Sequence, residues 1–315
     1  MRLLPPDPIT IIIPALNAER TIIQALQSAL TQTFAPYQVL IVDDQSTDRT
    51  SQIVRSFQER HPNLHLISGP GIGVSGAVNV GAKIVTSPLI ARLDADDIAE
   101  PTRLERQAQA MQDHPDWALC STYVSVIDTH GAPLGKILKS PLEPESIRHS
   151  LLKKNCLYQP SIIYRRCLID AVGGYRIFYR RAQDYDLYLR LMETRKMGCI
   201  PEVLTRYRIH PTQATGDIAK TYKLYGDAAL LCALARRRGC PEPHFTHENL
   251  AAQVQEVLRK ELLHSDHCEL SAWTSRRMIT RQKNAGLEIT GIKRLALKTI
   301  LKRFELKEAL KTALL

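Results

Sequence analysis

The stretch IARLDADD (residues 90–97) joins an apolar run to three carboxylates, Asp94, Asp96 and Asp97. The run from Leu89 to Leu93 has the continuous apolar character of a buried strand. Like charges a few ångströms apart repel one another and raise one another's pKa, so a bare cluster costs stability unless a positive group lies among them. The stretch therefore predicts a strand that leaves the core at a site requiring a cation.

Three similar apolar runs precede this one, and each is followed by a pattern typical of a helix. The expected strands cover residues 9–13, 39–42 and 64–67, and the expected helices cover residues 22–30, 46–57 and 77–85. Strands and helices that alternate at this spacing predict an α/β fold with a mostly parallel sheet covered by helices on both faces. In such sheets ligands bind beyond the carboxyl ends of the strands.

Polar side chains follow three of these strands. Asn17 and Glu19 come after the first, Asp43 and Asp44 after the second, and the acidic residues of 94–97 after the fourth. Five Asp carboxylates are thus expected on one edge of the sheet, and clustered carboxylate oxygens suit Mg²⁺ or Mn²⁺ completed by phosphate oxygens. The alternative is a solvated acidic turn in which Asp97 caps the next helix.

The alternation loosens after residue 100. A helix is expected over 101–111, a hairpin from 118–127 and 134–138, a strand over 161–164, a helix over 183–195 and helical structure from 221 onward. The hydrophobic content of 44% and charged content of 23% are ordinary for a globular protein. Seven cysteines without a CxxC pair favour free thiols in a reducing compartment, and no signal peptide is evident, so we expect a cytoplasmic protein.

The net charge of +10 is unevenly spread along the chain. Residues 1–217 carry 24 Lys and Arg against 22 Asp and Glu, whereas residues 218–315 carry 18 against 10. This change predicts two regions of different character, one over residues 1–215 and a basic helical region over residues 216–315.

Six sequence blocks together carry a family resemblance. In chain order they are ITIIIPALNAERTI, VLIVDDQSTDRT, GIGVSGAVNVGAK, LIARLDADDIAEPTRLERQ, GGY and QDYDLYLRL. Their order and spacing, over roughly residues 9–212, resemble inverting family 2 glycosyltransferases of the GT-A fold. The resemblance implies a metal-dependent hexosyltransferase that takes a sugar from a nucleotide diphosphate, with a UDP-sugar as the expected donor. The expected acceptor is a saccharide or lipid-linked glycan in surface polysaccharide biosynthesis.

The resemblance also implies positions for the nucleotide. The segment from Pro14 to Glu19 would line the base pocket, Asp44 would bond the base, and the Asp94 block would contact the ribose. The implied nucleotide-binding residues are Pro14, Leu16, Asn17, Glu19, Asp44, Asn79, Asp94 and Asp96. The chain departs from the family where Val78 stands in place of the usual Arg, and Lys83 one turn later is a candidate replacement.

The implied Mg²⁺ or Mn²⁺ ion would be held by Asp94, Asp96 or Asp97, with Asp96 favoured. His210, in the block RYRIHPTQ, matches a position that can reach the diphosphate and is a further candidate metal ligand, and a structural role for it stays equally open.

The implied catalytic base is Asp184, in a block that usually reads Glu-Asp and here reads Gln183-Asp184. Base and metal must flank the sugar from two sides, because the base deprotonates an acceptor hydroxyl that attacks opposite the diphosphate. Asp186, two residues further along the expected helix, points elsewhere, and we expect a surface or capping carboxylate there.

Two alternatives to the transferase are a nucleotidyltransferase on a related sheet and a non-catalytic adaptor. The basic Gly-rich loop expected near the first strand of a nucleotidyltransferase is absent from PALNAERT. The amphipathic basic run over 293–315 could lie on an anionic membrane at the inner face, as a peripheral attachment, or pack on the catalytic domain. No nucleic-acid motif accompanies the charge.

Overall fold

The computed structural model describes residues 9–210 and 217–264. The strands are β1 (Ile9–Ala15), β2 (Tyr37–Asp43), β3 (Leu64–Ser68), β4 (Leu89–Arg92), β5 (Ile98–Ala99), β6 (Trp117–Ile127), β7 (Pro133–Leu138), β8 (Ile163–Arg165) and β9 (Lys196–Arg208). Within the described residues they form one sheet in the order β3-β2-β1-β4-β8-β6-β9-β5, and β7 pairs with β6. This confirms the predicted α/β class.

The first half of the sheet is parallel, as predicted. Strand β1 pairs in parallel with β2 and β4, and β2 pairs in parallel with β3. The β1 residues Ile9, Ile12 and Ile13 are fully buried, which explains why these strands read as continuous apolar runs. Ala15 is opposite Asp43 in the register, so the polar segments after β1 and β2 leave the sheet side by side.

The first strand was predicted to end at Ile13, before Pro14, but β1 continues through Pro14 to Ala15. Strand β4 pairs with β1 only as far as Ile12, so at Pro14 the strand has a neighbour only on the β2 side. Proline is tolerated there because one side of the strand requires no N–H donor.

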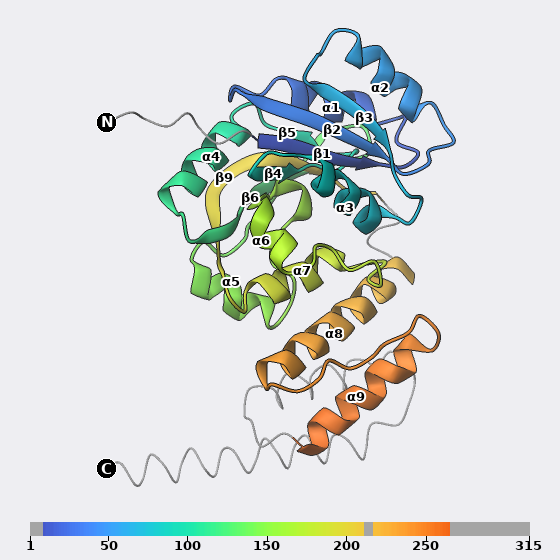
Figure 1. Ribbon diagram of the computed structural model, residues 1–315, viewed down its shortest axis with the longest axis vertical. Helices are drawn as coiled ribbons and strands as arrows, with labels where there is room; N and C mark the ends of the chain where they lie inside the picture. The colour runs from blue at the N-terminus through green and yellow to red at the C-terminus, as the bar shows by residue number, and fades with distance from the viewer. Residues whose placement is uncertain (1–8, 211–216, 265–315) are drawn as a thin grey trace. The chain divides into compact units, whose positions relative to one another are not determined.

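Helices cover both faces of the parallel half. Helices α1 (Ile22–Leu30) and α2 (Thr50–Gln58) lie on one face, and α3 (Val74–Ile84) lies on the other (Figure 1). Helix α3 packs very closely on β1 and β2, because a Cβ at Gly81 would lie 3.2 Å from both Ile12 Cγ2 and Val42 Cγ2. The glycine therefore allows α3 to approach the sheet.

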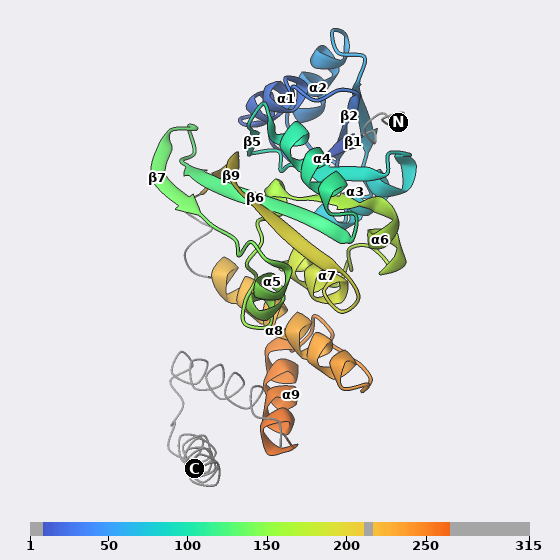
Figure 2. The ribbon, with the colours of Figure 1, turned by 90° about the vertical axis from the view of Figure 1, so that its left-hand side faces the viewer.

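Antiparallel strands extend the sheet beyond β4. Strand β8 runs antiparallel to both β4 and β6, and β9 runs parallel to β6. The predicted hairpin is confirmed as the antiparallel pair β6 and β7 (Figure 2). The remaining elements are α4 (Arg103–Asp113), α5 (Pro144–Leu151), the 3-10 turn η1 (Gln159–Ser161), α6 (Arg166–Ala171), α7 (Gln183–Leu191), α8 (Asp217–Arg237) and α9 (Leu250–His264).

The chain forms two compact units, residues 1–233 and 234–315. The charge change predicted a boundary near residue 216, whereas the division between the units falls within α8. The second unit contains α9 and an ion pair of 2.8 Å between Arg236 and Glu242. None of the helices described is long and apolar enough to cross a membrane. The basic run over 293–315 lies outside the described residues.

Candidate active site

The first positive group among the strand-end carboxylates is Arg92, the last residue of β4. Its side chain is fully buried, and Nη2 lies 2.8 Å from Asp94 Oδ1, whose side chain is 32% exposed. The guanidinium also donates to the carbonyl oxygen of Ile12 in β1. Burial raises the pKa of Asp94, and the charge of Arg92 opposes that rise. The chain itself therefore supplies, through Arg92, part of the positive charge that the acidic stretch requires.

A second buried arginine, Arg103 of α4, supports the first. Its Nη2 donates to the carbonyl oxygens of Arg92 (2.7 Å) and Ile162 (3.1 Å), and its Nε donates to Gln107 Oε1 (3.0 Å). Burial, together with the neighbouring charge of Arg92, lowers the pKa of Arg103 to about 9. Neither arginine was predicted as a site residue, although a single Arg inside the apolar run of β4 is a usable signal.

Asp97 is enclosed and binds β9. Its Oδ1 accepts from the backbone N–H of Arg208 at 2.7 Å, and its side chain is almost fully buried. Burial and the charges of Asp96 and Asp94 raise the pKa of Asp97 well above its ordinary value. The alternative in which Asp97 caps the next helix is wrong, because its carboxylate bonds β9 and the residue preceding α4 is Thr102.

The Arg208 side chain fixes the same turn from the other direction. Its Nε donates to the Asp96 carbonyl oxygen (2.6 Å), Nη1 to the Asp128 carbonyl oxygen (2.9 Å), and Nη2 to Gln24 Oε1 (2.6 Å). The acidic turn is thus held by β9, by the β6–β7 turn and by α1.

Asp96 is the acidic residue that meets His210. Its Oδ2 lies 3.0 Å from His210 Nε2, and the two side chains are 32% and 35% exposed. The described part of the chain contains no group of three or more His, Cys, Asp and Glu side chains arranged to hold a metal. A metal ion at Asp96 and His210 would therefore complete its coordination with phosphate oxygens and water, which is how Mg²⁺ is usually bound.

Asp184 lies in the first turn of α7 and is almost fully buried. Its Oδ2 accepts from Asn155 Nδ2 at 2.7 Å, while its buried Oδ1 has no hydrogen-bond partner in the described ranges. Burial raises the pKa of Asp184 to about 6, against hydrogen bonds from the Tyr185 backbone and Asn155, and the charge of Asp94 adds to the rise. The predicted base and the acidic turn therefore interact electrostatically, although Asp184 follows Asp94 by 90 positions in the chain.

Tyr207 of β9 lies within reach of all these acids. Burial raises its pKa, and the charges of Asp97, Asp94, Asp96 and Asp184 raise it further. The charges of the acidic turn and of the predicted base therefore act on the same hydroxyl, and their assignment to one site stays a prediction.

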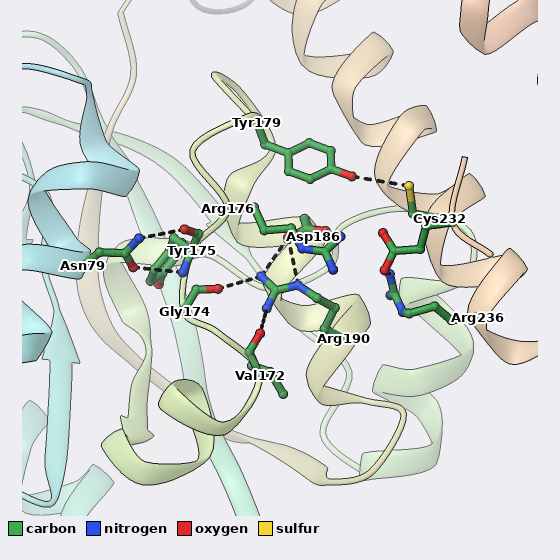
Figure 3. A network of polar contacts seen from close by, with 11 residues as sticks. Asn79, Val172, Gly174, Tyr175, Arg176, Tyr179, Asp186, Arg190, Cys232 and Arg236 are labelled. Atoms are coloured by element: carbon green, nitrogen blue, oxygen red, sulfur yellow. Dashed lines mark hydrogen bonds and ion pairs between the residues drawn. The ribbon is translucent and has the colours of Figure 1, made fainter. Parts of the chain in front are cut away.

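Asp186 does not lie on the surface, and that prediction is wrong. Its side chain is fully buried, and Oδ2 accepts from Arg190 Nη2 (2.7 Å) and Nε (3.0 Å), with Arg176 Nη1 3.7 Å from Oδ1 (Figure 3). Arg190 also donates to the carbonyl oxygens of Val172 and Gly174. The pair thus connects α7 to the GGY loop.

Asn79 of α3 holds the same loop from its other side. Its Nδ2 donates to the Tyr175 carbonyl oxygen (2.7 Å), and its Oδ1 accepts from the Tyr175 N–H (2.9 Å) (Figure 3). Gly174 has φ of +67°, and a Cβ there would lie 2.8 Å from Asn79 Oδ1. Asn79 is therefore engaged with backbone, and its predicted nucleotide contact stays a prediction.

The residues predicted to form the base pocket lie on two loops that bond one another. Asp44 accepts from the N–H groups of Gly71 and Gly73, each at 2.7 Å, and so fixes the loop before α3. Asn17, with φ of +50°, accepts from the Thr47 N–H at 2.8 Å. Three further residues were predicted to line the base pocket. Pro14 lies in β1, Leu16 is exposed, and Glu19 is paired with Arg49 at 3.2 Å.

Comparison with known proteins matches residues 10–173 to the model of glycosyl transferase family 2. An Escherichia coli relative, UDP-Glc:alpha-D-GlcNAc-diphosphoundecaprenol beta-1,3-glucosyltransferase WfgD, is 27% identical over 70% of this chain and 84% of its own.

Solved structures share the fold. S. aureus TarS in complex with UDP-GlcNAc superposes with a TM-score of 0.59 at 16% identity, over 85% of this chain and 78% of its own. The mannosyltransferase PcManGT from Pyrobaculum calidifontis, in complex with GDP-Man and Mn²⁺, superposes with a TM-score of 0.54 at 17% identity, over 94% of this chain and 86% of its own. The match to the family model spans more than half of the sequence, and the sheet has the GT-A arrangement, so the chain belongs to glycosyl transferase family 2 and is a glycosyltransferase.

Proposed function

We propose that this glycosyltransferase moves a sugar from a UDP-sugar to a hydroxyl of a saccharide or lipid-linked acceptor, with inversion at the anomeric carbon. The observation that carries the proposal is the buried carboxylate of Asp184, which has one oxygen bonded to Asn155 and the other without a partner among the described residues. The family assignment sets aside the nucleotidyltransferase alternative. The buried carboxylate of Asp184, whose pKa is raised in part by the charge of Asp94, argues against the alternative of a non-catalytic adaptor.

In the proposed reaction Asp184 Oδ1 accepts the proton of the acceptor hydroxyl. The acceptor oxygen then bonds to the anomeric carbon as the bond from that carbon to the diphosphate oxygen breaks on the opposite face. Because the base has a pKa of about 6, it is mostly ionised near pH 7 and still strong enough to take a proton. The diphosphate leaves as a nucleoside diphosphate.

Asp96 and His210 are the residues that would hold Mg²⁺ or Mn²⁺, with Asp94 at their side. When bound, the ion would neutralise charge on the leaving diphosphate. Asp97 is enclosed and bonded to the backbone of β9, so we assign it to holding the turn. Arg92 keeps Asp94 in place and offsets part of the negative charge of the acidic turn.

Support for the donor and the acceptor comes from the similar proteins. TarS was solved with UDP-GlcNAc, and the E. coli relative is named for transfer from UDP-Glc to a diphosphoundecaprenol-linked sugar. We therefore propose a UDP-sugar as donor and a lipid-linked acceptor, with Asp44 and Asn17 near the uracil base of the nucleotide. Cytoplasmic location and peripheral attachment to the membrane stay predictions.

Calorimetric titration with UDP, GDP and dTDP, each with and without Mn²⁺, tests the nucleotide site. We expect one diphosphate, UDP, to bind in a manganese-dependent way. Asp96→Ala should weaken this binding by at least about tenfold. Even the loss of a residue that only hydrogen-bonds a metal ligand lowers metal affinity by that amount. Asp113→Ala, an exposed acid at the end of α4, is the matched control and should bind normally. Equal binding by Asp96→Ala and wild type would refute the assignment of Asp96.

The pH dependence of turnover tests the base. Asp184 acts only when deprotonated, and its raised pKa places the loss of the carboxylate form near pH 6. We therefore expect the turnover of a nucleotide sugar to be level above this pH and to fall about tenfold per unit below it. Diphosphate binding measured over the same range separates this effect from unfolding. A profile that stays level to about pH 4.5, below which an unperturbed carboxyl protonates, would contradict the assignment.

A further inference from the structure

The hydrogen bonds around the predicted base continue to a helix outside the matched family segment. Asn155, between α5 and η1, donates from Nδ2 to Asp184 Oδ2 (2.7 Å) and to the Tyr222 hydroxyl (3.0 Å). Its Oδ1 accepts from the Leu157 N–H (3.2 Å). An amide nitrogen has two hydrogens, so both are used and the carbonyl oxygen is held as well. The Asn155 amide therefore has one preferred orientation.

Tyr222 lies in the first turns of α8, whereas the family match ends at residue 173. Tyr222 as a whole residue is 39% exposed and does not belong to the buried core, so core packing alone does not account for the bond of its hydroxyl to Asn155. Burial of the hydroxyl and the charge of Asp184 raise its pKa well above the ordinary value, so the phenol keeps its proton.

Helix α7 is anchored independently of this chain of contacts. The Tyr185 hydroxyl donates to the Leu151 carbonyl oxygen at 2.5 Å and ties α7 to α5. Asp186 and Arg190 bond within the same helix. Loss of the Asn155 contact would therefore leave the helix in place and release only the Asp184 carboxylate, which could then rotate about its terminal torsion.

We propose that Tyr222 and Asn155 are positioning residues for the base. The hydroxyl of Tyr222 orients the Asn155 amide, and the amide holds Asp184 Oδ2, so that Oδ1 is the oxygen presented to the acceptor. The inference rests on the proposed role of Asp184 as base. It assigns a part in the reaction to the first turns of α8.

Three variants test the chain of contacts: Tyr222→Phe, Asn155→Ala and the double variant. Phenylalanine keeps the ring and removes only the hydroxyl. Wild type is first assayed for diphosphate release from UDP-, GDP- and dTDP-sugars with Mn²⁺, and the sugar turned over fastest is used for the variants. Tyr37→Phe, the same change at the opposite end of the parallel strands, is the matched control.

We expect each single variant to lower kcat by about tenfold, because a hydrogen bond that aligns a charged group is lost. The double variant should be no slower than the slower single variant, because both changes break one linkage. Affinity for UDP with Mn²⁺ should be unchanged in all three, which also shows that the variants are folded.

If Tyr222→Phe keeps full activity while Asn155→Ala is slow, the claim that Tyr222 of α8 positions the base is wrong. Losses that multiply in the double variant would show that the two residues act separately, and would overturn the linkage. Asp184→Asn is assayed in parallel. If its kcat is normal, the proposed role of Asp184 as base is wrong. If Asp184→Asn is inactive while Tyr222→Phe has a normal kcat, only the positioning role of Tyr222 is wrong.

Discussion

Asp184→Asn is expected to lower the turnover of nucleotide sugar by about 10²- to 10⁴-fold, the range that general base catalysis contributes. The substitution keeps the shape of the side chain and leaves an oxygen that can still accept from Asn155, but the amide cannot take a proton at neutral pH. The measurement is the initial rate of nucleoside diphosphate release at saturating donor.

Two comparisons make this result specific. Binding of UDP with Mn²⁺ should be unchanged in Asp184→Asn, because the base faces the acceptor and not the diphosphate. Asp170→Asn, an exposed acid on α6, should turn over normally. An Asp184→Asn protein with wild-type kcat would refute the base, and a protein that also lost UDP binding would show that the residue supports the nucleotide site instead.

Asp186→Ala is expected to lower the free energy of unfolding by about 3–5 kcal/mol, because it leaves the nearly buried guanidinium of Arg190 without its charge partner. The measurement is urea unfolding followed by circular dichroism. Asp186 lies in the first unit, residues 1–233, so the transition of that unit is the one to follow.

The chain provides a matched control for this prediction. Arg166 and Asp170 also form a pair four residues apart on a helix, but they are 3.4 Å apart and their side chains are 33% and 51% exposed. Asp170→Ala should cost no more than about 0.5 kcal/mol, as exposed helical pairs do. Similar costs for the two variants would contradict the claim that burial makes the Asp186 pair important.

The parallel half of the fold could be predicted from sequence because strands buried on both faces must be apolar throughout. The expected strands at residues 9–13, 39–42 and 64–67 match β1, β2 and β3 apart from their ends. Strand β9 was not predicted, because its sequence KMGCIPEVLTRYR contains Pro201 and Glu202 and shows no clear alternation. Its pairing with β6 joins segments far apart in the chain.

The location of the site was predictable, but its internal contacts were not. The rule that ligands bind at the carboxyl ends of parallel strands places the Asp44 and Asp96 segments on one edge. Arg92 and Arg208 are charged residues that a single sequence assigns to the surface by default, and only the folded chain shows them buried beside the acids. Asp186 was misjudged for the same reason, because α7 is buried on every side from Asp184 onward.

The charge pattern indicates a change in composition near residue 216, and the compact units divide after Ala233. Helix α8 begins at Asp217, just after the predicted boundary, and contains the division between the units. Tyr222, in the first turns of α8, lies in the first unit and bonds to Asn155. The predicted domain boundary stays a prediction.

The stereochemistry of donor turnover is the most direct test of the central claim, that Asp184 promotes a single inverting displacement. An α-linked nucleotide sugar that the protein accepts is incubated with Mn²⁺ and water as acceptor, and the released sugar is followed by proton NMR before mutarotation. We expect the β-anomer to appear first. Appearance of the α-anomer first would contradict the central claim.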